Sequence, residues 1–231
     1  MNDVLALWER AGAAAPSARD DALLGDAAPA SLSARNAALL ALRSRLLGAT
    51  QRLRAACPAC GAALEFTIDC DALARALQPA ADAGSVHELR CDGYRIAYRV
   101  PGIDDWRAAA ASTDFAPVLM QRCIARCERD DGVPCAAASL PPSVTDALSS
   151  ALEALEPGAC VDFDLRCPEC AAQWSAPMDC AAVLYGEVRA RAEALLVEVD
   201  ALARAYGWSE AQVLALSPTR RAAYLQLVGA A

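Results

Sequence analysis

The pattern of apolar and polar positions predicts a helix near the start of the chain. Leucines recur at helical spacing between residues 39 and 47, with Ser33 as the expected N-cap and Gly48 as the expected stop. Another amphipathic helix is predicted from residue 143, ending before the Pro157-Gly158 pair. Helices therefore account for much of the chain.

Residues 181–206 predict a long helix, because their apolar positions alternate four and three residues apart as in a heptad seam. Such a seam packs either on the core of its own chain or against a second copy, so self-association through this helix stays open. Two short helices follow. Ser209 with Gln212 forms a capping box for the first, and Ser217-Pro218 opens the second.

Strict alternation of apolar and polar residues predicts strands beside two cysteine motifs, at residues 64–68, 161–165 and 173–178. A further hairpin is predicted where Asp92-Gly93 joins two alternating runs, since both turn positions favour positive φ. The expected fold class is α+β: mostly helical, with a small antiparallel zinc-ribbon sheet. Three segments are expected: an N-terminal helical segment (1–50), a zinc-ribbon core (51–180) and a C-terminal helical part (181–231).

The two cysteine motifs are copies of one pattern. "CPACGAALEFTIDC" at residues 57–70 returns as "CPECAAQWSAPMDC" at residues 167–180. A Cys-x-x-Cys turn delivers two thiolates to a tetrahedral zinc ion at about 2.3 Å. We therefore expect two Cys-Pro-x-Cys knuckles to hold one structural Zn²⁺ with four ligands, which are Cys57, Cys60, Cys167 and Cys170.

The other cysteines have no metal-ligand spacing. Cys70 and Cys180 lie ten residues beyond the second cysteine of each knuckle, which is about 30 Å of extended strand. They are expected to be small buried residues where strand becomes helix. The same packing role is expected for the remaining five, namely Cys91, Cys123, Cys127, Cys135 and Cys160.

No catalytic constellation is expected. A redox Cys-x-x-Cys opens a helix whose dipole lowers the thiol pKa, whereas strand is expected after each knuckle of this chain. Catalytic zinc keeps an open coordination position, which four thiolates would close. A zinc-ribbon nucleic-acid-binding protein is the alternative function, with Arg90, Arg95 and Arg99 as its candidate patch.

Charge and hydropathy limit the partners and the cellular location that we expect for the protein. The formal net charge of −8 works against phosphate binding and therefore disfavours nucleic acid as a partner. The N-terminal residues lack the pattern of a secretory signal, and no apolar run approaches the roughly 20 residues that span a bilayer. We expect a cytoplasmic protein without a membrane partner, whose cysteines bind metal rather than form disulfides.

Several segments together carry a resemblance to a known family. They are "LWER", "CPACGAALEFTID", "DGYRIAYRVPGIDD", "LMQRC", "RCPECAAQWSAPMD" and, most specifically, "YGWSEAQVLALSPTRRAAYLQLV". In these the chain resembles the baseplate proteins and baseplate hub assembly chaperones of T-even-type contractile phage tails, prophages and contractile injection systems. The chain departs from the family at Val100-Pro101-Gly102 and Asp105-Trp106, and in the loops at 11–30 and 128–142.

The resemblance implies a non-enzymatic protein that helps to build or form a baseplate by binding tail hub proteins. It would act in the cytoplasm, or in the finished virion or tail-like particle if it is retained there. Aromatic and arginine side chains are enriched at the centres of interfaces. The candidate partner contacts, which could equally pack a C-terminal helical hairpin on the long helix, are Tyr206, Trp208, Arg220, Arg221 and Tyr224.

Overall fold

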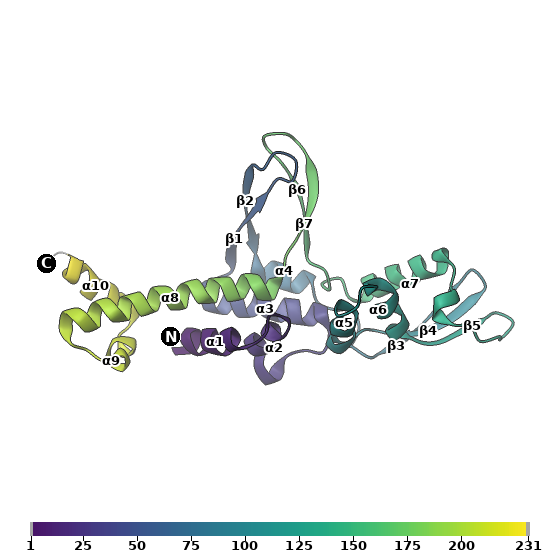
Figure 1. Cartoon of the computed structure of the whole chain (residues 1–231), viewed down its shortest axis with the longest axis horizontal. Helices are drawn as coiled ribbons and strands as arrows, with labels where there is room; N and C mark the ends of the chain where they lie inside the picture. The colour runs from purple at the N-terminus through teal and green to yellow at the C-terminus, as the bar shows by residue number, and fades with distance from the viewer. Residues whose placement is uncertain (1, 230–231) are drawn as a thin grey trace. The chain divides into compact units, whose positions relative to one another are not determined.

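The computed structural model describes residues 2–229 and divides into two compact units (Figure 1). One unit combines the chain up to Leu23 with the chain from Ala181 onward, and the other runs from Leu24 to Cys180. The segment expected over residues 1–50 is thus split between the units. The reason is that its first helix packs with the long C-terminal helix, whereas residues 32–47 pack within the second unit.

The expected α+β class is confirmed, with 55% of the chain helical. Helices alone make up the first unit, which contains α1 (Asn2–Ala13), α2 (Arg19–Leu24), α8 (Cys180–Tyr206), α9 (Glu210–Ala215) and α10 (Pro218–Gly229). In α1 to α10, the described helices, none has the length and apolar character needed to cross a membrane.

The heptad seam of α8 is buried within its own chain. Ala192 and Leu195 pack with Leu5 of α1, and Val199 and Leu202 pack with α9 and α10 through Val213 and its neighbours. Apolar burial of this kind removes the surface that a second copy would need. These seam residues therefore serve the fold, and self-association through the helix stays a prediction.

The second unit places strands among helices α3 (Leu32–Leu47), α4 (Cys70–Ala76), α5 (Ile103–Ala110), α6 (Phe115–Cys123) and α7 (Pro142–Leu155). Its strands are β1 (Thr50–Ala56), β2 (Ala63–Asp69), β3 (Val86–Cys91), β4 (Tyr94–Arg99), β5 (Ile124–Arg129), β6 (Asp162–Arg166) and β7 (Gln173–Pro177).

These strands form antiparallel sheets of the orders β1-β2, β3-β4-β5 and β6-β7. The single ribbon sheet expected from the knuckles is thus two separate two-stranded hairpins. The hairpin expected at Asp92-Gly93 is confirmed, with φ of 49° and 80° at the two turn residues. Ile96 and Tyr98 of β4 pack with Val144 and Leu148 of α7 to form the core behind this sheet.

Two helix boundaries differ from the sequence-based expectation. The N-cap of α3 is Ser31, whose Oγ accepts the Ala34 N–H at 3.1 Å, and not Ser33. Ser33 is instead buried, and its Oγ accepts the Gly158 N–H at 2.8 Å. The apolar positions of residues 115–127 predict a helix that includes Ile124, but helix α6 ends at Cys123. Ile124 begins β5 instead, because that strand pairs with β4.

Candidate metal centre

Each cysteine knuckle forms the tip of a hairpin. Strands β1 and β2 pair from Thr50 with Asp69 to Ala56 with Ala63, and the first knuckle joins them. The Gly61 N–H closes this turn on the Cys57 carbonyl at 2.8 Å, and the Ala171 N–H closes the second on the Cys167 carbonyl at 3.0 Å. Residues Gly61 and Ala171 occupy the same turn position with φ of 75° and 60°. The sequence repeat is therefore also a repeat of backbone structure.

Figure 1 shows the two hairpins standing side by side, so that their tips bring the four knuckle cysteines together. The Sγ atoms of Cys57 and Cys170 lie 3.6 Å apart, as do those of Cys60 and Cys167. All four sulfurs lie within 4.8 Å of one another, and such a cluster could hold a metal ion. Each close pair joins a cysteine of one knuckle to a cysteine of the other, and each knuckle contributes two of the four sulfurs.

The cluster is asymmetric in exposure. The first cysteine of each knuckle, Cys57 or Cys167, is 2% exposed, whereas Cys60 and Cys170 are exposed. Burial raises the pKa of the Cys57 thiol, but hydrogen bonds from the Cys60 and Ala59 amides and from neighbouring thiols outweigh it and lower that pKa to about 7.

Apolar contacts hold the hairpins together below their tips. Phe66 of β2 and Phe163 of β6 pack edge to face with ring centroids 5.3 Å apart. Such a pair stabilises by about 0.5–1.5 kcal/mol beyond its area burial. At the base, Cys70 and Cys180 are buried where each hairpin turns into a helix, as expected, and the Cys70 thiol donates to Gln51 Oε1 at 3.5 Å.

The remaining cysteines do not share one role. Cys123 is fully buried, as expected, but Cys160 is exposed and Cys91 is half-buried. Cys127 and Cys135, which were expected to be free, form a disulfide. Strand β5 and the returning loop bring their Cα atoms to 5.5 Å, and the Cys135 N–H donates to the Cys127 carbonyl at 3.0 Å. The separation of eight residues between the two cysteines did not by itself predict that the chain turns back here.

The candidate partner residues separate into buried and exposed groups. Arg221 is 1% exposed, and it donates to Glu198 Oε2 at 2.8 Å and to the Leu216 carbonyl at 3.0 Å. The three aromatic residues pack on one another, with ring centroids 4.7–5.6 Å apart. Tyr206 keeps 39% exposure and Arg220 is exposed. Arg221 therefore belongs to the fold.

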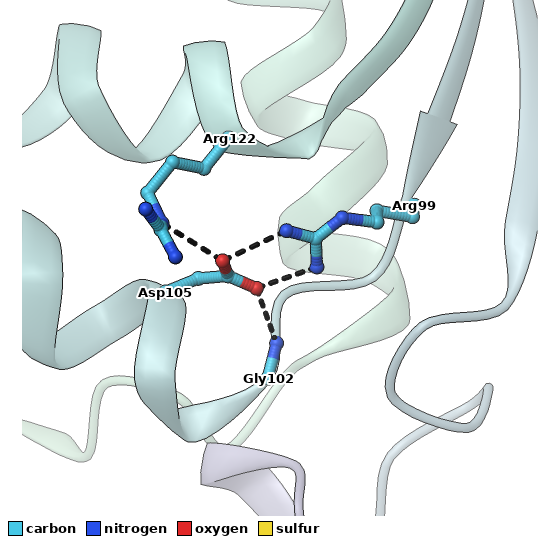
Figure 2. A network of polar contacts seen from close by, with 4 residues as sticks. All are labelled: Arg99, Gly102, Asp105 and Arg122. Atoms are coloured by element: carbon cyan, nitrogen blue, oxygen red, sulfur yellow. Dashed lines mark hydrogen bonds and ion pairs between the residues drawn. The ribbon is translucent and has the colours of Figure 1, made fainter.

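A buried ion network in the second unit was missed by the sequence analysis (Figure 2). Asp105 accepts from both Arg99 guanidinium nitrogens at 2.5 and 2.8 Å, from Arg122 Nε at 2.9 Å and from the Gly102 N–H at 3.0 Å. The Arg99 hydrogen bonds, opposed by burial and helped by Gly102 and Arg122, lower the Asp105 pKa to about 2. Arg99 thus forms an ion pair with Asp105 within the second unit.

Comparison with protein-family models, curated proteins and solved structures finds no match to this chain. The four-cysteine cluster is the feature of the structure that bears on function.

Proposed function

We propose that the four knuckle thiolates hold one structural zinc ion, which joins the two hairpins. The observation that carries this proposal is the cluster of four sulfurs within 4.8 Å. Four sulfurs at the vertices of a tetrahedron, each about 2.3 Å from zinc, lie about 3.8 Å apart. The two cross-hairpin distances of 3.6 Å are close to that value. Soft thiolate ligands in this geometry favour zinc over the hard cations magnesium and calcium.

A zinc ion bound by four thiolates has no open position for substrate or water, so its role in this proposal is structural. It would fix two hairpins that are more than one hundred residues apart in the chain, as the separations of 113 and 107 residues between paired cysteines show. Metal binding of this kind contributes directly to folding free energy. The protein is then a scaffold rather than an enzyme.

For this scaffold we propose a place in a contractile tail, as a baseplate component or a baseplate hub assembly chaperone. Support comes from the resemblance described above, above all from the C-terminal segment that forms the end of α8 together with α9 and α10. A net charge of −8 and the absence of a basic face on the knuckles suit protein partners better than nucleic acid. Assembly would take place in the cytoplasm.

The exposed part of the C-terminal aromatic cluster is the contact surface that we propose for tail hub proteins. Tyr206 stacks on Trp208 with centroids 4.7 Å apart, and Arg220 and the 61% exposed Leu227 lie on α10. Aromatic and arginine side chains on a rigid helical support are typical of interface centres, because they bury large area at low entropic cost.

The test is affinity purification of the tagged full chain from its natural host, with partners identified by mass spectrometry. Baseplate or tail hub proteins should co-purify with the wild type and should be lost with Arg220→Glu, while the melting temperature is unchanged. Persistence of the chain in purified particles would identify a permanent subunit, and its absence a chaperone. Recovery of no tail protein, with salt-dependent retention of DNA or RNA instead, would replace this proposal by the nucleic-acid alternative.

A further inference from the structure

Two of the four knuckle cysteines are open to small molecules in solution. The first cysteine of each knuckle is 2% exposed, whereas the second, Cys60 or Cys170, is exposed. The turn residues beside them are mostly alanine, glycine and proline, which are too small to cover a neighbouring sulfur. A small oxidant such as a peroxide can therefore reach Cys60 and Cys170 directly.

Each exposed cysteine lies against a buried cysteine of the other hairpin. The Sγ atom of Cys60 is 3.6 Å from that of Cys167, and the Sγ atom of Cys170 is 3.6 Å from that of Cys57. The sulfurs of a disulfide are about 2.05 Å apart, so each pair has to approach by about 1.5 Å. The phenylalanine pair below the tips, with ring centroids 5.3 Å apart, keeps the hairpins against each other. Both close pairs are thus placed to form a bond between the hairpins.

We propose that the knuckle cluster is a redox switch in which a peroxide replaces the metal by two disulfides between the hairpins, Cys57–Cys170 and Cys60–Cys167. This inference rests on the proposed zinc centre, because a thiol bound to zinc is present as the thiolate, the form that attacks a peroxide. Zinc joins the hairpins in reducing surroundings, and covalent bonds join them in oxidising ones. The hairpins therefore stay together in both states.

Each disulfide forms in two steps that balance. The exposed thiolate attacks one oxygen of hydrogen peroxide, the O–O bond breaks, and a sulfenic acid and a hydroxide ion result. The buried thiolate then attacks the sulfenic sulfur, the S–S bond forms, and a second hydroxide ion leaves. The two sulfurs together lose the two electrons that reduce the peroxide, and the two hydroxide ions take up two protons as water. Two peroxide molecules thus oxidise all four thiolates, and no thiolate is left to hold a metal ion.

Disulfide mapping of the full chain tests the switch. The protein is purified without reductant under nitrogen, its zinc content is measured, and about two equivalents of hydrogen peroxide are added. It is then alkylated and digested with trypsin and Asp-N protease without reduction. Cleavage at arginine and aspartate leaves the peptides 55–68 and 167–178, each of which contains only the two cysteines of its own knuckle. Disulfides between the hairpins join these peptides, whereas disulfides within each knuckle leave them separate.

The peptides should be recovered joined, and about one zinc ion per chain should be released to the chelating dye 4-(2-pyridylazo)resorcinol. Dithiothreitol should separate the peptides and restore zinc binding, because thiol–disulfide exchange is reversible. The melting temperature of the oxidised protein should no longer respond to a chelator, since its hairpins are joined by covalent bonds instead of the metal.

Variants with a matched control identify the pairing. Cys60→Ser should still give the link between Cys57 and Cys170 and should leave Cys167 open to alkylation. Pairing within the knuckles would instead leave Cys57 open and join Cys167 to Cys170. Cys160→Ser is the control, because Cys160 is exposed and free but lies outside the cluster, and its replacement should leave the wild-type link unchanged. If Cys60→Ser does not fold, the wild-type peptide map decides.

The failure of the switch and the failure of the zinc proposal give different results. Separate peptides from a zinc-loaded protein, or knuckle thiols that stay open to alkylation or end as sulfinic acids, would overturn the switch and leave the zinc proposal intact. A wild type purified without zinc would contradict the zinc proposal, and with it the exchange of metal for disulfides.

Discussion

The thiol of Cys57 lies 3.6 Å from the thiol of Cys170, although 113 residues separate the two along the chain. Each sulfur belongs to a different hairpin, and each hairpin is closed by its own backbone hydrogen bonds. The contact between them therefore depends on how the hairpins pack and on what the four thiols bind.

If zinc holds this contact, loss of one buried ligand should release the metal. Purified wild-type protein should contain about one zinc ion per chain, and Cys57→Ser should contain almost none and melt several degrees lower. Inductively coupled plasma mass spectrometry and thermal unfolding measure the two effects. Cys160→Ser is the matched control, because Cys160 is free and exposed outside the cluster and its replacement should change neither. A metal-free wild type would contradict the zinc proposal.

Asp105→Asn should destabilise the second unit by about 2 kcal/mol, since a buried carboxylate that accepts three hydrogen bonds from two arginines is replaced by a neutral amide. Urea unfolding of the variant measures the loss. Asp104→Asn is the adjacent control, because Asp104 is exposed and its change should stay within about 0.5 kcal/mol. Equal effects of the two variants would show that the ion network does not contribute to the stability of the second unit.

The Asp105 carboxyl group should also make the free energy of unfolding depend on pH. The Asp105 pKa is lowered from 3.8 to about 2 in the folded protein, so its contribution is complete above about pH 4 and is lost as the pH falls through 2. A shift of this size corresponds to about 2 kcal/mol. The difference in unfolding free energy between wild type and Asp105→Asn should therefore shrink between about pH 4 and pH 2. A difference that stays constant over this range would contradict the lowered pKa.

Gly158→Ala should destabilise the protein by about 1–3 kcal/mol, because a Cβ at this position would lie 2.7 Å from both the Cβ and the carbonyl oxygen of Leu77. The backbone oxygen cannot move aside without breaking local structure. Gly186→Ala on α8 is the control, since its Cβ would meet nothing within 4 Å and alanine should stabilise that helix by up to about 1 kcal/mol. Chemical denaturation should thus give opposite signs for the two substitutions.

Arg221→Met should destabilise the first unit by about 2 kcal/mol, because it removes the buried donor that lies 2.8 Å from Glu198 Oε2 and the donor to the Leu216 carbonyl. Among the described residues, Glu198 then keeps only Arg191, at 3.6 Å. Arg220→Met, at the neighbouring exposed position, should stay within about 0.5 kcal/mol. Thermal unfolding distinguishes the pair. A stable Arg221→Met protein would return Arg221 to the set of partner contacts.

The Cys127–Cys135 disulfide should lower the number of cysteines that can be alkylated without reduction. Of eleven cysteines, nine are free, so alkylation of the denatured, unreduced protein should add nine labels by mass, and alkylation after reduction should add eleven. Cys135→Ser should raise the unreduced count to ten by freeing Cys127, and should lower stability by about 2 kcal/mol. Eleven labels without reduction would mean that Cys127 and Cys135 are separate thiols.

Features that depend only on neighbouring residues could be predicted from the sequence. The Asp92-Gly93 turn, the capping box at Ser209 and the knuckles at Cys57 and Cys167 follow from local backbone and metal-ligand chemistry, and the structure places turns and caps at these positions. Strand β1 was not predicted. The internal repeat did indicate it, since a strand precedes the second knuckle and the first knuckle should match it.

Features that depend on residues far apart in the chain could not be predicted in this way, because they follow from how the helices and strands pack. Ser33 could cap a helix by its local sequence, but the fold uses its hydroxyl to bind the Gly158 N–H. Arg221 resembled an exposed contact residue until α10 packed it against Glu198. The α8 seam was equally suited to a partner copy and to its own chain, and α1, α9 and α10 occupy it. In each case residue type sets which interactions are favourable, whereas packing decides which partner is within reach.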